Sequence, residues 1–65
     1  GMAAVSAVYL NAGAADIYAE TGDLEPCLKY LREAVKLAPA VLLRQACGNA
    51  EKVIESAFPE RFVVA

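Results

Sequence analysis

Two cysteines are the most nucleophilic side chains in this sequence, and their surroundings decide which chemistry is open to them. Cys27 and Cys47 lie 20 residues apart, and the sequence contains no histidine that could activate a thiol or complete a zinc site. Cys27 falls in the first turns of a predicted helix, where the thiol pKa can be lowered. A disulfide would require an oxidising compartment. The pattern favours two small buried hydrophobic side chains with free thiols in a reducing cytoplasm.

Paired carboxylates are the second feature that could do chemistry. Asp16 and Glu20 are four residues apart and share one face of a helix, so they could act as acid and base or hold a hard cation. Two carboxylates without a third or fourth ligand make a poor metal site, and we interpret the pair as a solvated helix end. Ser6 and Ser56 lack a histidine base. We therefore predict no catalytic residue, metal site or cofactor, and a protein that is not an enzyme.

The tyrosines are a third candidate group. Tyr9, Tyr18 and Tyr30 could line a groove for a small ligand. Their rings are equally suited to packing at helix contacts while the hydroxyl groups reach water or a carbonyl oxygen. We favour the packing interpretation.

The composition indicates that the chain does not stay alone. Its 65 residues are near the lower limit for one self-sufficient core, and 58% of them are hydrophobic even without glycine, against a usual ~45–50% with glycine included. A small monomer cannot bury so much apolar surface. The surplus predicts a homo-oligomer, with a dimer favoured, or a heterologous protein partner.

The charge pattern argues against two other kinds of partner. Six basic and eight acidic residues leave a formal charge of −2, and the basic residues are scattered along the chain. No basic stripe could neutralise phosphates, so we expect neither nucleic-acid binding nor attachment to an anionic membrane surface. The apolar N-terminal segment lacks the positive start of a signal peptide, and no run is long enough for a transmembrane helix. We expect a cytoplasmic protein with one domain over residues 2–65, Gly1 being the remnant of a cleaved tag.

The first predicted helix covers about residues 3–20 and is rich in alanine, which favours helix. Apolar residues occupy more than one of its sides, a pattern typical of a helix that is covered on more than one side. One stripe consists of Val5, Val8, Tyr9, Ala12, Ala15 and Ala19, and a second one of Leu10, Ala14, Ile17 and Tyr18.

Two further helices follow. Gly22 can form the left-handed end of the first helix, and Asp23 is a suitable N-cap for an amphipathic helix over about 24–37. Pro39 disfavours helical geometry at the preceding residue and can begin a third helix over about 40–57. Gly48 marks a possible kink or close helix crossing within that helix, and Pro59 ends it. The short connections predict an all-α fold, a three-helix antiparallel bundle with a short apolar C-terminal tail.

The hairpin resembles a tetratricopeptide repeat, a helix-turn-helix unit with small and large residues at fixed offsets. The resemblance covers roughly residues 8–39, about half of the chain, as a single repeat. Asn11 and Ala14 depart from it, because they stand where the family favours a large residue and leucine. The matching positions are Ala15, Tyr18, Gly22, Asp23, Cys27, Leu31, Ala34 and Pro39. The resemblance implies a protein-binding role and supplies no catalytic residue.

The sequence thus predicts a small non-catalytic interaction or structural module that self-associates through its first helix. Two alternatives remain open, namely an accessory subunit or fragment of a larger enzyme complex and a regulatory protein that binds a small ligand between the first two helices. The residues predicted to contact a partner are Val5, Val8, Tyr9, Ala12, Ile17, Tyr18, Phe62 and Val63.

Overall fold

The computed structural model describes residues 1–63, and all regular secondary structure in that part of the chain is helical. The predicted all-α fold is therefore confirmed. The elements are α1 (Met2–Thr21), α2 (Leu24–Leu37), α3 (Ala40–Ala46), α4 (Glu51–Ala57) and a 3₁₀ turn, η1 (Pro59–Arg61).

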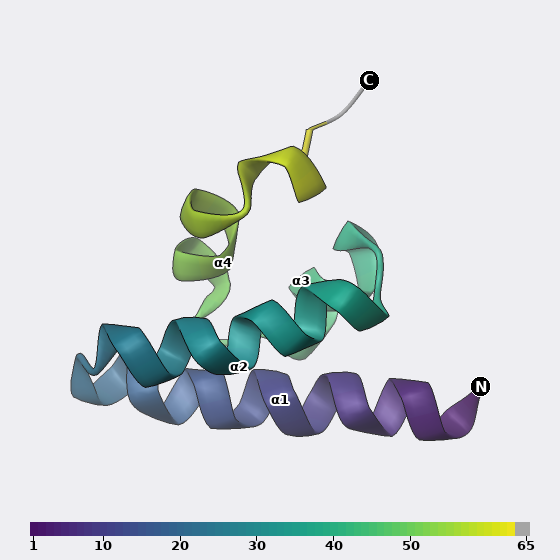
Figure 1. Cartoon of the computed structure of the whole chain (residues 1–65), viewed down its shortest axis with the longest axis horizontal. Helices are drawn as coiled ribbons and strands as arrows, with labels where there is room; N and C mark the ends of the chain where they lie inside the picture. The colour runs from purple at the N-terminus through teal and green to yellow at the C-terminus, as the bar shows by residue number, and fades with distance from the viewer. Residues whose placement is uncertain (64–65) are drawn as a thin grey trace.

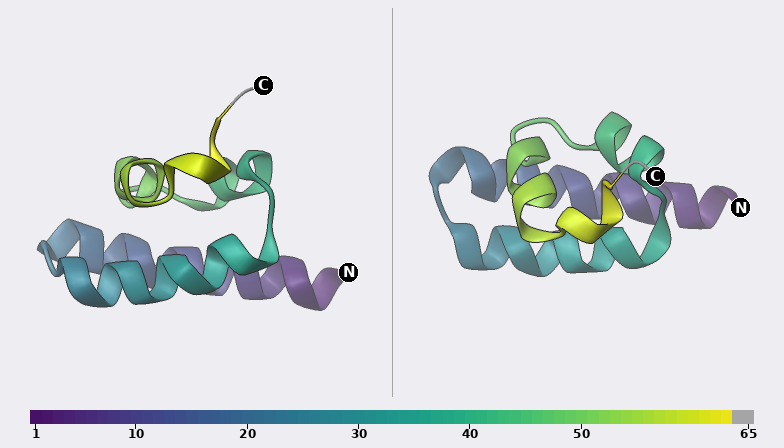
Figure 2. Two further views of the ribbon diagram at one scale, coloured as in Figure 1. Left: turned by 45° about the horizontal axis from the view of Figure 1, so that its top comes forward. Right: turned by 90° about the horizontal axis from the view of Figure 1, so that it is seen from above.

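The helices are arranged in two layers. Figure 1 shows α1 and α2 side by side and antiparallel, with α3, α4 and η1 together on one side of this pair. The left view of Figure 2 shows the same division, with the long hairpin as one layer and the short helices as the other. Within this arrangement α3 packs on α1, and α4 packs on α2. Within residues 1–63, no element covers the opposite side of the hairpin.

The turn between α1 and α2 forms as the sequence predicts. Gly22 adopts a left-handed conformation with φ 83°, and the N–H of Asp23 donates a 2.9 Å hydrogen bond to the carbonyl oxygen of Tyr18. Such a turn satisfies carbonyl groups that the helix end leaves free. Asp23 occupies the N-cap position of α2, but its carboxylate accepts a hydrogen bond from the Thr21 hydroxyl group and makes no capping bond. The predicted position is confirmed and the predicted capping contact is wrong.

The single third helix predicted over residues 40–57 is wrong. Ala38 is extended before Pro39, and α3 begins after the proline as expected. The helix then stops at Ala46, and the chain makes a turn over residues 47–50 before α4 begins. Four α-helices, and not a three-helix bundle, therefore form the described part of the chain. The turn at the break is in contact with α1, as described below.

Small residues dominate the core. The two layers meet at side chains from all four helices and from the turn, and no charged or polar residue is buried among the described residues. The buried residues are Val8, Ala12, Ala15, Cys27, Leu31, Ala34, Val35, Ala38, Leu43, Cys47, Ala50 and Ile54. Ala12, Ala15 and Ala34 let the hairpin helices approach closely, which a larger side chain at these positions would prevent.

The predicted apolar tail is only partly a tail. Pro59 ends α4 and begins η1, after which Phe62 packs against the core. The guanidinium carbon of Arg44 lies 5.0 Å from the centre of the Phe62 ring, within the range of a cation–π contact. Val63 is exposed, and the last two residues of the predicted tail, 64 and 65, lie outside the described part of the chain.

Gly22 provides a direct test of the hairpin. Replacing Gly22 with alanine is expected to lower the free energy of unfolding by about 1 kcal/mol, because a side chain is strained at positive φ. The measurement is equilibrium urea unfolding at low protein concentration. Gly13→Ala is the matched control: Gly13 lies in the middle of α1 with open space beside it, so alanine should raise stability by up to about 1 kcal/mol. Equal effects of the two substitutions would contradict the assignment of Gly22 as the helix end.

Candidate functional site

The carboxylate of Asp16 holds the turn between α3 and α4. Both of its oxygen atoms lie 2.9 Å from the backbone nitrogen of Gly48, and Oδ1 also accepts a 2.8 Å hydrogen bond from the N–H of Ala50. One helical turn further along α1, Glu20 accepts a 3.1 Å hydrogen bond from the side-chain amide of Asn49. The interpretation as a solvated helix end is therefore wrong for Asp16, which is partly buried and holds the turn, whereas Glu20 stays exposed to solvent.

The start of α4 explains why a carboxylate is needed there. Ala50 occupies the N-cap position of α4, and its side chain has no oxygen to accept a hydrogen bond. Asp16 supplies the missing acceptor, and its negative charge lies at the positive end of the helix dipole. A Cβ atom at Gly48 would lie 3.2 Å from Oδ2 of Asp16, so glycine permits the close approach. Asp16 is thus a structural group that fixes the second layer on the first.

The cysteines are buried, as predicted, and both thiols are free. Burial raises the pKa of Cys47 to about 11, and the nearby negative charge of Asp16 acts in the same direction. The pKa of Cys27 is also raised, again by burial first and then by Asp16. Burial therefore outweighs the effect of the helix start on Cys27, and neither thiol has the lowered pKa of a nucleophile.

The tyrosines fall into two groups. The rings of Tyr18 and Tyr30 are stacked, with their centres 6.0 Å apart and their planes 9° from parallel, so they join α1 to α2. Tyr9 is about half exposed. Among residues 1–63, no three histidine, cysteine or acidic side chains come together in a way that could hold a metal ion.

The side of α1 that faces away from the core carries large apolar side chains. Leu10 is 75% exposed and Ile17 is 65% exposed, although both lie in the middle turns of a long helix. The segment from Met2 to Ala15 has no charged residue. One side of α1 consists entirely of exposed residues at alternating spacings of three and four; we call it the outer strip, and its members are Ala3, Ser6, Leu10, Gly13, Ile17 and Glu20.

The structure separates the residues that were predicted to contact a partner. Val8 and Ala12 are completely buried in the chain's own core, so their assignment to a partner interface is wrong. Tyr18 and Phe62 are partly buried against the same core. The exposed members of the predicted set are Val5, Tyr9, Ile17 and Val63. Helical periodicity identified the two stripes of α1 but could not show which stripe the chain covers itself.

Leu10 and Gly13 were not among the predicted interaction residues. Leu10 belongs to the second apolar stripe of the helix, and its side chain is the most exposed one on that stripe. The sequence feature that could have identified Leu10 is the regular spacing of the outer strip, in which Leu10 and Ile17 are seven residues apart.

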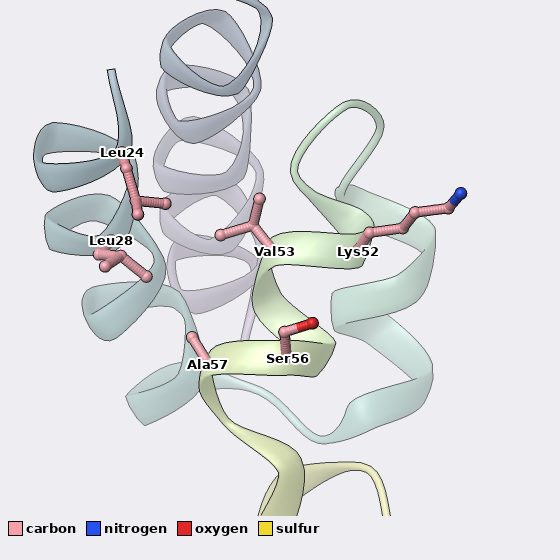
Figure 3. Close-up of a pocket in the computed structure, with 6 residues that line it drawn as sticks. All are labelled: Leu24, Leu28, Lys52, Val53, Ser56 and Ala57. Carbon is pink, nitrogen blue, oxygen red and sulfur yellow. The ribbon is translucent and has the colours of Figure 1, made fainter. Parts of the chain in front are cut away.

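A shallow apolar groove lies between α2 and α4. It has a volume of about 400 Å³, and Figure 3 shows Leu24 and Leu28 of α2 opposite Val53 and Ala57 of α4. Lys52 and Ser56 stand at its edge. The small-ligand alternative placed its groove between the first two helices, where α1 and α2 are in direct contact, whereas the groove described here lies between α2 and α4.

Comparison of the chain with protein-family models, with curated proteins and with solved structures finds no match. Within residues 1–63, none of the helices has the length and apolar character needed to cross a membrane.

Asp16 is expected to be the most sensitive charged position in the chain. Asp16→Ala should lower the free energy of unfolding by about 2–3 kcal/mol, because the buried N–H of Ala50 loses its acceptor. Equilibrium urea unfolding measures this change. Glu33→Ala is the matched control: Glu33 pairs with Lys36 on the exposed surface, so its loss should cost no more than about 0.5 kcal/mol. A similar small cost at both positions would show that Asp16 does not hold the turn.

Cys47 is expected to make stability depend on alkaline pH. The folded chain keeps the thiol proton up to a pKa of about 11, whereas the unfolded chain releases it near the ordinary value of 9.0. The resulting stabilisation is complete below pH 9 and is lost as the pH rises towards 11. Urea unfolding at several pH values should therefore show a steeper decline for the natural chain than for Cys47→Ala. Parallel declines would contradict the burial of this thiol.

Proposed function

We propose that this chain is a small, non-catalytic protein-interaction module that self-associates through α1. The observation that carries the proposal is the exposure of Leu10 and Ile17 on an uncharged side of the longest helix. Burying a leucine or isoleucine side chain contributes about 1.5–3 kcal/mol. A second copy of the chain offers the same apolar surface, so pairing would bury both at once.

The architecture supports this choice of surface. The second layer covers one side of the hairpin only, as Figure 2 shows. Asp16, in the acidic C-terminal part of α1, holds that layer through its carboxylate. What remains on the far side of α1 is apolar or small over most of its length. A self-associating hairpin also accounts for a hydrophobic content of 58%, which the buried residues of one copy do not exhaust.

A tetratricopeptide-like character of the hairpin is part of the same proposal. Ala15, Cys27, Leu31 and Ala34 stand at matching positions of that repeat, and all four are completely buried between the helices. Repeats of this kind stack on neighbours to complete their core. In a chain with one such hairpin, a second copy would take the place of the neighbouring repeat. The free thiols fit a reducing compartment such as the cytoplasm.

A second candidate is an accessory subunit that docks on a different protein. The groove between α2 and α4 favours it, because Leu24 remains 57% exposed beside Leu28 and Val53. An apolar side chain from a partner, or a small apolar ligand, could fill this groove. Isolation of the chain from its native host distinguishes the candidates, since only this one expects a stoichiometric partner of different sequence.

The double variant Leu10→Lys/Ile17→Lys tests self-association. The natural chain is expected to form dimers at micromolar concentration, and the double variant should weaken dimerisation at least ~100-fold, because two apolar contacts are lost twice by symmetry. Its stability as a monomer should be nearly unchanged, since both side chains lie outside the core. Sedimentation equilibrium measures the association, and urea unfolding measures the stability.

Val41→Lys is the matched control for this experiment. Val41 is 67% exposed and lies on α3, away from the outer strip, so its replacement should leave dimerisation unaltered. A natural chain that sediments as a monomer at about 100 μM, the weak end of specific association, would remove the proposal.

A further inference from the structure

We infer that two copies of the chain pair through the outer strip with their α1 helices antiparallel and a twofold axis between residues 11 and 12. This inference rests on the proposed self-association and adds the register and direction of the pairing. It is carried by the order of large and small residues along the strip.

The spacing of the outer strip matches a helix–helix contact. Its members follow one another at intervals of three, four, three, four and three residues. This alternation keeps a line of residues facing a partner helix along its whole length. α1 is a single unbroken helix of 20 residues, so the strip runs along all of it.

Antiparallel pairing places each large residue of the strip opposite a small one. With the axis between residues 11 and 12, Leu10 lies opposite Gly13 of the second copy, and Ile17 lies opposite Ser6. The space beside Gly13 is open, because a Cβ atom built there meets no atom of the described residues within 4 Å other than the neighbouring backbone of its own helix. Leu10 of the second copy would fill this space. The twofold axis creates the same contact twice.

Parallel pairing in register lacks this fit. It would place Leu10 beside Leu10 and Gly13 beside Gly13, so that the paired small residues leave space that no side chain fills. It would also bring the two Glu20 carboxylates side by side at the same end, where like charges repel.

The charges favour the antiparallel direction independently. α1 has no acidic side chain in its first turn and no basic one in its last turn, so its own dipole is left without compensation. Antiparallel pairing places Glu20 of one copy, which also accepts a hydrogen bond from Asn49 of its own chain, beside Ala3 in the first turn of the other. The carboxylate then lies near the positive end of the partner's helix, which a parallel pair does not allow.

The area of the outer strip indicates how strongly two copies are expected to bind each other. A helix of 20 residues is about 30 Å long and about 10 Å wide, so the strip covers roughly 300 Å². A standard interface covers about 800 Å² on each partner. We therefore expect a dissociation constant in the micromolar range.

Gly13→Leu tests whether dimerisation depends on the shape of the outer strip or on its hydrophobicity alone. Leucine adds apolar surface to the strip and also favours helix, so the monomer should unfold at a higher temperature. It fills the space that Leu10 of the second copy needs, and dimerisation should therefore weaken at least tenfold. The matched control is Ala4→Leu, which adds the same kind of side chain at an exposed position of α1 outside the strip and should leave dimerisation unaltered.

A charge exchange tests the direction of the helices. Ser6→Lys and Ile17→Glu should each weaken dimerisation at least tenfold. In an antiparallel dimer the double variant brings the introduced lysine of one copy opposite the introduced glutamate of the other, at both ends of the interface. It should regain at least tenfold over the weaker single variant. The two positions are about 16 Å apart along one helix, so any such recovery comes from contacts between copies.

The outcomes distinguish this inference from the proposed function. Dimers that tolerate Gly13→Leu, or a double variant weaker than both single variants, would overturn the antiparallel register while self-association stands. Absence of dimers in the natural chain would instead remove the proposed function.

Discussion

The bond between one carboxylate of α1 and the turn after α3 is the contact on which the two-layer arrangement depends. Asp16 accepts hydrogen bonds from the backbone N–H groups of Gly48 and Ala50, which lie more than 30 residues further along the chain. The segment after Pro39 lies over the hairpin as two short helices, and this contact holds the turn between them. The contact also places a negative charge near the buried Cys47 thiol, which is one reason why its pKa rises.

α1 has two sides, and their side chains differ in size. On the inner side, Ala12 and Ala15 allow α2 and the second layer to approach closely, so a core can form from few residues. On the outer side, Leu10 and Ile17 project from the chain with small residues between them. Small domains bury a smaller fraction of their surface than large ones, and the described part of this chain covers only the inner side of the 20-residue helix. The self-association proposed above would cover its outer side.

Local signals were sufficient for the hairpin. Gly22, the amphipathic pattern of the second helix and Pro39 each act within a few residues, and the structure agrees with the bounds they predict to within one residue at most. The prediction of one third helix was wrong because contacts with a distant segment, and not local signals, accompany its break. The segment from Ala40 to Phe58 has helical spacing throughout, and Gly48 marked a kink or close helix crossing there but not a full break. At the break the N–H of Gly48 donates to an acceptor 32 residues away along the chain, which no local pattern contains.

The helical class, the turn at Gly22, the burial of the two cysteines and the surplus of apolar residues could all be predicted, because they depend on composition, local backbone preference and periodicity. Which stripe of the first helix is buried, and what Asp16 binds, could be seen only in the folded chain. Val8 and Ala12 became core and Leu10 stayed exposed because the second layer packs on one side of the hairpin. That choice depends on contacts between segments far apart in the sequence, and periodicity within one helix carries no information about its neighbours.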